Sequence, residues 1–114
     1  MDDCIFCKII RGDIPSTKVY EDENVYAFKD IHPAAPIHVL IVPKKHIMSL
    51  EALNDENIHE VIPIHRAIQY VTEIMGISDK GYRVIINCGA EAGQTVMHLH
   101  YHILGGMKMS EKII

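Results

Sequence analysis

The hydrophobic residues of this chain follow two spacings, and each spacing predicts its own kind of element. Runs of β-branched and other apolar residues predict five strands, at residues 18–21, 25–31, 37–42, 82–87 and 95–104. A helical spacing predicts a short helix at residues 5–11 and a long helix at 55–75, which end at Gly12 and Gly76. Strands joined mainly by short turns, with one long and one short helix, predict an α+β fold with a mainly antiparallel five-stranded sheet.

The long helical segment contains one residue that fits badly. Its apolar residues, among them Ile58, Val61 and Ile68, fall on one stripe, and Asn54 precedes them as a candidate N-cap. Pro63 lies inside the segment, where proline removes a backbone donor and crowds the preceding turn. We therefore expect a kink or a broken first turn at Pro63, in a helix that otherwise forms.

Length and charge narrow the class of protein. A chain of 114 residues is long enough for one domain, and we expect residues 1–114 to form it. The net charge of −4 argues against a nucleic-acid partner, which would need a basic face. No apolar run approaches the roughly 20 residues that span a bilayer, and the start MDDCIFC lacks the regions of a signal peptide. We therefore predict a cytoplasmic protein without a membrane partner, whose three cysteines form no disulfide scaffold.

Three of the eight histidines alternate along the last predicted strand. His98, His100 and His102 should share one face, while the apolar residues between them face the core. Alternate residues of a strand are roughly 6.6 Å apart, so one metal ion could not bind all three imidazoles. Residues 88–94, just before them, form a loop of small residues whose backbone amides could bind phosphate oxygens, while one imidazole attacks phosphorus and a neighbour moves protons. The simpler alternative is a solvent-facing strand that contains histidines by chance.

These residues resemble the histidine-triad (HIT) family, whose motif is His-φ-His-φ-His-φ-φ with φ apolar, and only the partly polar Tyr101 departs from it. The resemblance extends to the segments FCKIIRGDIP, FKDIHPAAPIH, VPKKH and GQTVMHLHYHILGG, which are spread over most of the chain. Together they resemble the branch of small nucleoside phosphoramidases called Hint proteins, in a bacterial form with an N-terminal CxxC. The resemblance implies a HIT-like fold and hydrolysis of the P–N bond of purine nucleoside 5′-phosphoramidates, such as AMP–lysine-like or aminoacyl-AMP conjugates.

The resemblance also implies a role for each histidine of the site. His100 would attack the α-phosphorus and form a nucleotidyl-histidine that water then hydrolyses. His102 would contact the α-phosphate and help to neutralise charge in the transition state. His38 matches a further histidine of the family, which backs the nucleophile and holds its tautomer. Without the resemblance, His38 would be interpreted as a core histidine with satisfied hydrogen bonds.

A nucleotide-binding set is carried over in the same way. Residues around the base, at the ribose hydroxyls and at the phosphate and leaving group match Phe6, Ile9, Phe28, Asp30, Ile31, Asn87, Gly93, Thr95 and Val96. Asp30 would accept the ribose hydroxyls, and each apolar member taken singly could equally be a core residue. Thr95 replaces the serine of eukaryotic relatives but keeps a hydroxyl. The tail after Gly106 lacks the tryptophan–proline ending of those relatives, which bears on substrate selectivity.

The spacing Cys4-x-x-Cys7 is that of half a structural zinc site. Two buried thiols or a redox pair are the alternatives. His46 and His98 could complete a Cys₂His₂ set, as in a bacterial subgroup of relatives that this chain resembles. A structural zinc ion is therefore expected. Four residues are assigned no functional role: Cys88, as an ordinary small residue, and His32, His59 and His65, on a loop or helix surface.

Two other functions stay open at this point. One is hydrolysis of dinucleoside polyphosphates, as in another branch of the family, and the other is a nucleotide-binding adaptor or sensor with incidental catalysis. In every case the expected ligand is a purine nucleotide, and no organic cofactor is needed. A homodimer is also expected, with the long helix and the strand at 82–87 pairing across a two-fold axis.

Overall fold

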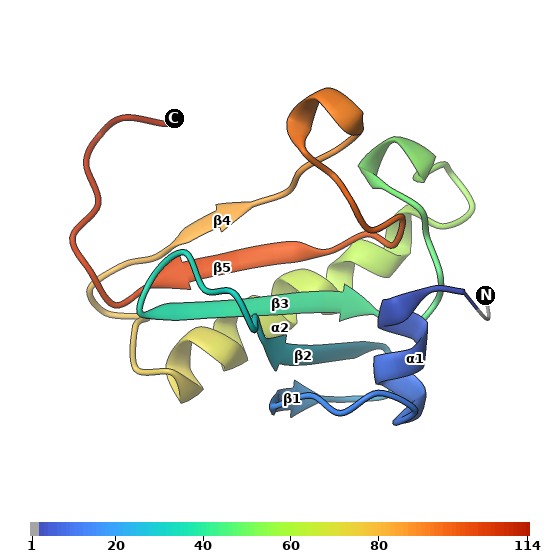
Figure 1. The fold of residues 1–114 in the computed structure, drawn as a ribbon, viewed down its shortest axis with the longest axis horizontal. Helices are drawn as coiled ribbons and strands as arrows, with labels where there is room; N and C mark the ends of the chain where they lie inside the picture. Colours follow the sequence, from blue (N-terminus) through green and yellow to red (C-terminus); the bar gives the residue numbers. More distant parts are fainter. Residues whose placement is uncertain (1–2) are drawn as a thin grey trace.

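The computed structural model describes residues 3–114 and contains one sheet with helices on both of its faces (Figure 1). Its regular elements are α1 (Ile5–Arg11), β1 (Lys18–Glu21), β2 (Val25–Lys29), β3 (Ile37–Pro43), α2 (Val61–Ile74), β4 (Arg83–Ile85) and β5 (Tyr101–Gly105). Short 3₁₀ turns lie at Leu50–Ala52, Ile58–Glu60 and Ala90–Ala92. The predicted α+β fold with a five-stranded antiparallel sheet, one short and one long helix is confirmed. No helix among residues 3–114 is long and apolar enough to cross a membrane.

The strand order is β1-β2-β3-β5-β4, and every neighbouring pair is antiparallel. The longest strand, β3, is central and places Leu40 opposite His102 and His38 opposite Leu104. Residues that lie opposite each other share a face, as do alternate residues of one strand. The register therefore puts His38 and His102 on the same side of the sheet, although they are 64 residues apart in the sequence.

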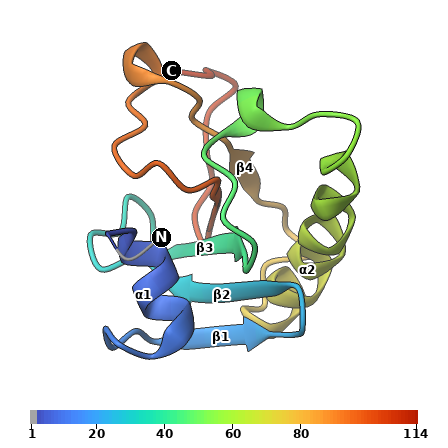
Figure 2. The same cartoon turned by 90° about the vertical axis from the view of Figure 1, so that its right-hand side faces the viewer.

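Helices α1 and α2 lie on opposite faces of the sheet (Figure 2). Each face carries its own hydrophobic cluster. Under α2, the larger cluster joins Val39 and Ile41 to Ile64 and Val71, all fully buried. Under α1, the smaller cluster joins Phe6 and Ile9 to alternate residues of β2 and β3, namely Tyr26, Phe28, Leu40 and Val42. Successive residues of β2 and β3 therefore alternate between the cluster under α1 and the cluster under α2.

The long helix begins later than predicted. The α-helix starts at Val61, after a 3₁₀ turn, so Pro63 lies in its first turn. Backbone N–H groups there have no partner within the helix, so proline removes nothing that the helix needs. Asn54 does not cap this helix, because its side chain accepts hydrogen bonds from the backbone of Glu56 and Asn57 in the turn before it. The helix ends one residue before Met75, close to the predicted end at Gly76.

Three predicted strands are shorter in the structure. β2 ends at Lys29 instead of residue 31, β4 covers only Arg83–Ile85, and β5 starts at Tyr101 instead of residue 95. Residues 95–100 are irregular because the side chain of Gln94 makes hydrogen bonds here in place of those between neighbouring strands. Buried Gln94 accepts from the backbone N–H of Gly89 and donates to the carbonyls of Met48 and Val96. The segment that holds two of the three histidines is thus a loop fixed by an amide side chain.

Candidate functional site

The three alternating histidines lie on the α1 side of the sheet. Leu99, Tyr101 and Ile103 belong to the cluster under α2, as the alternation predicts. His98 and His100 both lie edge-on to the ring of Phe6 in α1, with ring centres 5.9 and 5.0 Å away. The shared face is therefore as expected, although only His102 lies in a regular strand.

Among residues 3–114, His100 has a hydrogen-bond partner at one of its two ring nitrogens. Its Nδ1 lies 2.7 Å from the backbone carbonyl oxygen of His98. A carbonyl can only accept, so Nδ1 carries the hydrogen and donates it. In the neutral ring, Nε2 then holds an unshared electron pair. The side chain is 8% exposed, so this geometry is held by packing.

A second set of hydrogen bonds orients His102. The backbone N–H of Ala34 donates to Nδ1 of His38, at 3.0 Å, so the proton of the neutral His38 ring lies on Nε2. That Nε2 donates to Nδ1 of His102 at 2.9 Å, which leaves His102 with its own N–H at Nε2. The expectation that His38 holds the tautomer of His100 is therefore wrong. His38 holds His102, whereas the His98 carbonyl holds His100.

Burial favours the neutral form of the His38 and His102 rings. Loss of hydration lowers the pKa of His102 to about 4, with smaller contributions from the neighbouring His100 and His38. Loss of hydration also lowers the pKa of His38, partly offset by the Asp30 carboxylate. Near pH 7, His102 is therefore a neutral N–H donor, and it brings a hydrogen bond to the site instead of a full positive charge.

The residues expected around a base are partly together. Phe6, Ile9 and Phe28 are buried in the cluster under α1, and half-buried Val96 packs against it. Ile31 is 85% exposed and belongs to neither cluster. The other expected contacts lie on loops: Asn87 follows β4, and Gly93 and Thr95 flank Gln94.

Asp30 follows β2 and lies next to the paired histidines. One carboxylate oxygen accepts the backbone N–H of His32 at 2.8 Å, and the other lies 3.4 Å from Nε2 of His38. The side chain is 19% exposed, so it can still meet a ligand. The sequence did not indicate its contact with His38, nor the role of Gln94 in holding the loop. The only signal for Gln94 was its place among glycines and small residues.

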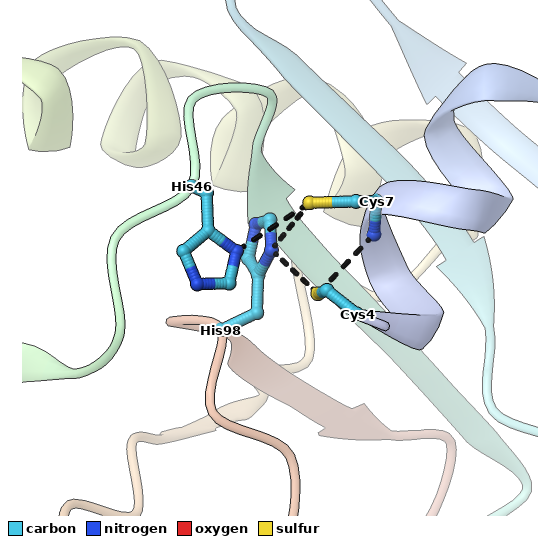
Figure 3. Close-up of side chains that lie close together, drawn as sticks. All are labelled: Cys4, Cys7, His46 and His98. Carbon is cyan, nitrogen blue, oxygen red and sulfur yellow. Dashed lines mark hydrogen bonds between the residues drawn. The ribbon is translucent and has the colours of Figure 1, made fainter. Parts of the chain in front are cut away.

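The four residues predicted for zinc come together between α1, the segment after β3 and the loop before β5 (Figure 3). Nδ1 of His98 lies 3.3 Å from Sγ of Cys4 and 3.6 Å from Sγ of Cys7, and Nδ1 of His46 lies 3.4 Å from Sγ of Cys7. Zinc–sulfur and zinc–nitrogen bonds at a tetrahedral ion place sulfur and nitrogen about 3.5 Å apart. These three sulfur–nitrogen separations therefore match those around one zinc ion, and all four donor atoms lie within 4.8 Å of one another.

The surroundings of this cluster also fit a metal. Nε2 of His98 donates to the backbone carbonyl of Pro43 at 2.8 Å, which directs the unshared pair of Nδ1 toward the two sulfurs. Cys4 is the N-cap of α1, and the backbone N–H of Cys7 donates to its sulfur at 3.4 Å. Burial raises the pKa of the Cys7 thiol and so disfavours the thiolate. A bound metal ion would stabilise that thiolate. A hollow of about 750 Å³ adjoins the cluster and is lined by Asp3, Cys4, Ile5, His46, Met48, Thr95, Val96 and Met97.

Fold and site together define a class: a small α+β domain whose candidate site is built from histidines oriented by backbone groups and by a neighbouring imidazole. The HIT domain family model matches residues 11–109, so the chain belongs to the HIT domain family. It is 48% identical over 109 residues, covering 96% of this chain and 95% of the relative, to an uncharacterized HIT-like protein of Synechocystis.

Solved structures agree with this assignment. A HIT family hydrolase from Clostridium thermocellum has a TM-score of 0.98 and 56% identity, covering 100% of this chain and 99% of that one. A histidine triad nucleotide-binding protein from Candida albicans has a TM-score of 0.77 and 35% identity, covering 98% and 87%. The fold and family are thus shared with proteins described as hydrolases and as nucleotide-binding.

Proposed function

We propose that this protein hydrolyses the P–N bond of purine nucleoside 5′-phosphoramidates through a nucleotidyl-histidine on His100. One observation carries the proposal: the His98 carbonyl holds the proton of His100 on Nδ1, so Nε2 of the neutral ring has the unshared pair that a nucleophile needs. Nε2 attacks the α-phosphorus, and the P–N bond of the substrate breaks as the leaving nitrogen takes up a proton from water. Water then attacks phosphorus and releases a nucleoside monophosphate and neutral His100.

His102 supports this chemistry as a hydrogen-bond donor. The hydrogen bond from His38 to Nδ1 of His102 leaves the His102 proton on Nε2. The ring centres of His102 and the nucleophile His100 are 5.1 Å apart. A donor in that place binds an α-phosphate oxygen and stabilises the charge that develops on it. The backbone of the loop around Gly93 supplies further donors.

The cluster under α1 supports a purine nucleoside as the rest of the substrate. Phe6, Ile9 and Phe28 offer apolar surface for a base, and the partly exposed Asp30 can accept ribose hydroxyls. The Candida albicans relative, described as nucleotide-binding, supports the same ligand class. Assignment to the Hint branch, with Asn87, Gly93, Thr95, Val96 and Ile31 as further nucleotide contacts, belongs to this proposal.

Zinc at Cys4, Cys7, His46 and His98 is part of the proposal as a structural ion. Four protein ligands leave no open position for a water molecule, so the ion would have a structural role and would tie α1 to the loop that carries His98.

We also propose a cytoplasmic homodimer formed by one domain over residues 1–114. Support for the dimer comes from β4, which is an edge strand with a half-exposed Val84, and from exposed Ile62 and Ile74 on α2.

The test uses adenosine 5′-phosphoramidate as substrate and the variant His100→Asn, with His59→Asn as the matched control on an exposed turn. We expect His100→Asn to lose at least about a thousandfold in kcat and His59→Asn to keep wild-type activity. Mass spectrometry of acid-quenched wild-type protein should detect the nucleotidyl adduct. Full activity of His100→Asn, or faster turnover of a diadenosine polyphosphate by the wild type, contradicts the proposal.

A further inference from the structure

Asp30 lies where it can act on more than a ribose. Its Oδ2 is 3.4 Å from Nε2 of His38, the same nitrogen that donates to His102. Because Ala34 donates to the other nitrogen of His38, the Nε2–H of that ring has two acceptors in reach, the His102 ring and the Asp30 carboxylate. The carboxylate therefore favours the one tautomer of His38 that can donate to His102.

Asp30 is itself held in place. Its Oδ1 accepts the backbone N–H of His32 at 2.8 Å, and its backbone N–H donates to the carbonyl of His38 at 3.0 Å. These two bonds fix the carboxylate against the start of β3, so Oδ2 points at the His38 ring before any ligand arrives. His38 is 8% exposed, and water therefore competes little for this contact.

We propose that Asp30 is a positioning residue that acts through His38 to hold the Nε2–H of His102 toward the phosphate. This inference rests on the proposed function, and it gives Asp30 a role that is independent of the ribose. If Asp30 lost its charge, the Ala34 N–H would still favour the His38 proton on Nε2, but that tautomer would lose the support of the carboxylate. His102 could then rotate or change tautomer, and the donor that faces the phosphate would be lost for part of the time.

The variant Asp30→Asn isolates this role. Asparagine keeps an oxygen that can accept from the His32 backbone, but its NH₂ group meets the Nε2–H of His38 with a second donor. The substrate is 2′,3′-dideoxyadenosine 5′-phosphoramidate, which has no ribose hydroxyl for Asp30 to bind, measured beside the ribose form. Asp79→Asn, which removes an exposed carboxylate from the turn after α2, is the control.

We expect Asp30→Asn to lower kcat about tenfold or more on both substrates, by analogy with the groups that orient metal-bound histidines, whose loss typically costs about 10–100-fold. For wild type and Asp79→Asn, KM should be higher for the dideoxy substrate than for the ribose form, because the dideoxy substrate lacks the ribose contact. If Asp30→Asn and wild type have the same kcat on the dideoxy substrate, Asp30 serves the ribose only and the inference is overturned.

A second measurement does not need activity. Nitrogen-15 NMR of the histidine rings in ligand-free protein should find His38 and His102 of the wild type protonated at Nε2, and a mixture of tautomers in Asp30→Asn. A wild-type His38 protonated at Nδ1, or identical ring spectra in the two proteins, overturns the inference. Wild-type protein that hydrolyses no phosphoramidate would instead contradict the proposed function, and the ring spectra would still decide the role of Asp30.

Discussion

Zinc binding should raise the thermal stability of this domain by an amount that can be worked out. The four donor atoms already lie within 4.8 Å of one another, so the ion needs little rearrangement of the fold. Free zinc at a hundredfold excess over its dissociation constant adds about 2.7 kcal/mol to the free energy of unfolding. A domain of 114 residues has an unfolding entropy near 0.24 kcal/mol per kelvin, so the melting temperature should rise by roughly 11 °C.

The variants Cys4→Ser and Cys88→Ser separate the metal from other effects of a cysteine. Serine at position 4 can still cap α1, so the first variant removes a metal ligand while it keeps the helix cap. Cys88 lies outside the group of four, and its variant should respond to zinc like the wild type. Calorimetry with zinc and with a chelator measures the difference, and elemental analysis measures the zinc content.

Two results would refute this reasoning. The first is a zinc-to-protein ratio near zero in wild-type protein purified without chelator, together with equal melting temperatures in zinc and in chelator. The second is a Cys88→Ser variant that loses the zinc response as fully as Cys4→Ser. The first result would leave Cys4 and Cys7 as two thiols at the start of a short helix, and the second would mean that the group of four is not the complete set of zinc ligands.

Three further predictions concern stability. As the pH falls from about 6.5 to about 4, His102 becomes protonated in the unfolded chain but not in the folded protein, so the free energy of unfolding should fall across this window. Urea unfolding in the presence of a metal chelator should show that this free energy depends less on pH in His102→Gln than in the wild type. Ile41→Ala should cost about 2–5 kcal/mol in chemical unfolding because Ile41 is fully buried, whereas Ile31→Ala, at an 85% exposed side chain, should stay within about 0.5 kcal/mol. Gly105→Ala should cost about 1–3 kcal/mol in the same assay, since a Cβ there would lie 2.7 Å from Cδ1 of Ile77, and an unchanged midpoint would contradict the packing described for β5.

Periodicity predicted the elements well where a regular ladder or helix satisfies the backbone. It failed at residues 95–100, because the Gln94 side chain and the carbonyl of Ile47 take the backbone partners that a strand would need. It also extended the long helix back to residue 55, where the Asn54 side chain stabilises a turn instead. In both places a local hydrogen bond from a polar side chain outweighs the apolar spacing.

The metal ligands illustrate a different level of prediction. Cys4 and Cys7 are one helical turn apart, so their sequence spacing alone brings the two thiols together. His46 and His98 join them only because β3 ends next to the loop before β5, and that proximity depends on the sheet. The residue types were predictable, and the separations of their donor atoms were not.

The sequence by itself determined the α+β class, the two hydrophobic faces, and which residues carry imidazole, thiol and carboxylate groups, because spacing and residue type depend on the chain alone. Only the tertiary structure decided which nitrogen of each ring holds its proton. Those choices depend on the carbonyls of Pro43 and His98 and the amide of Ala34, which pack within about 3 Å of the rings. The Pro43 carbonyl is 55 residues from the ring that it contacts, whereas the other two groups are two and four residues away, but each bond forms only when the fold orients its ring within hydrogen-bond distance.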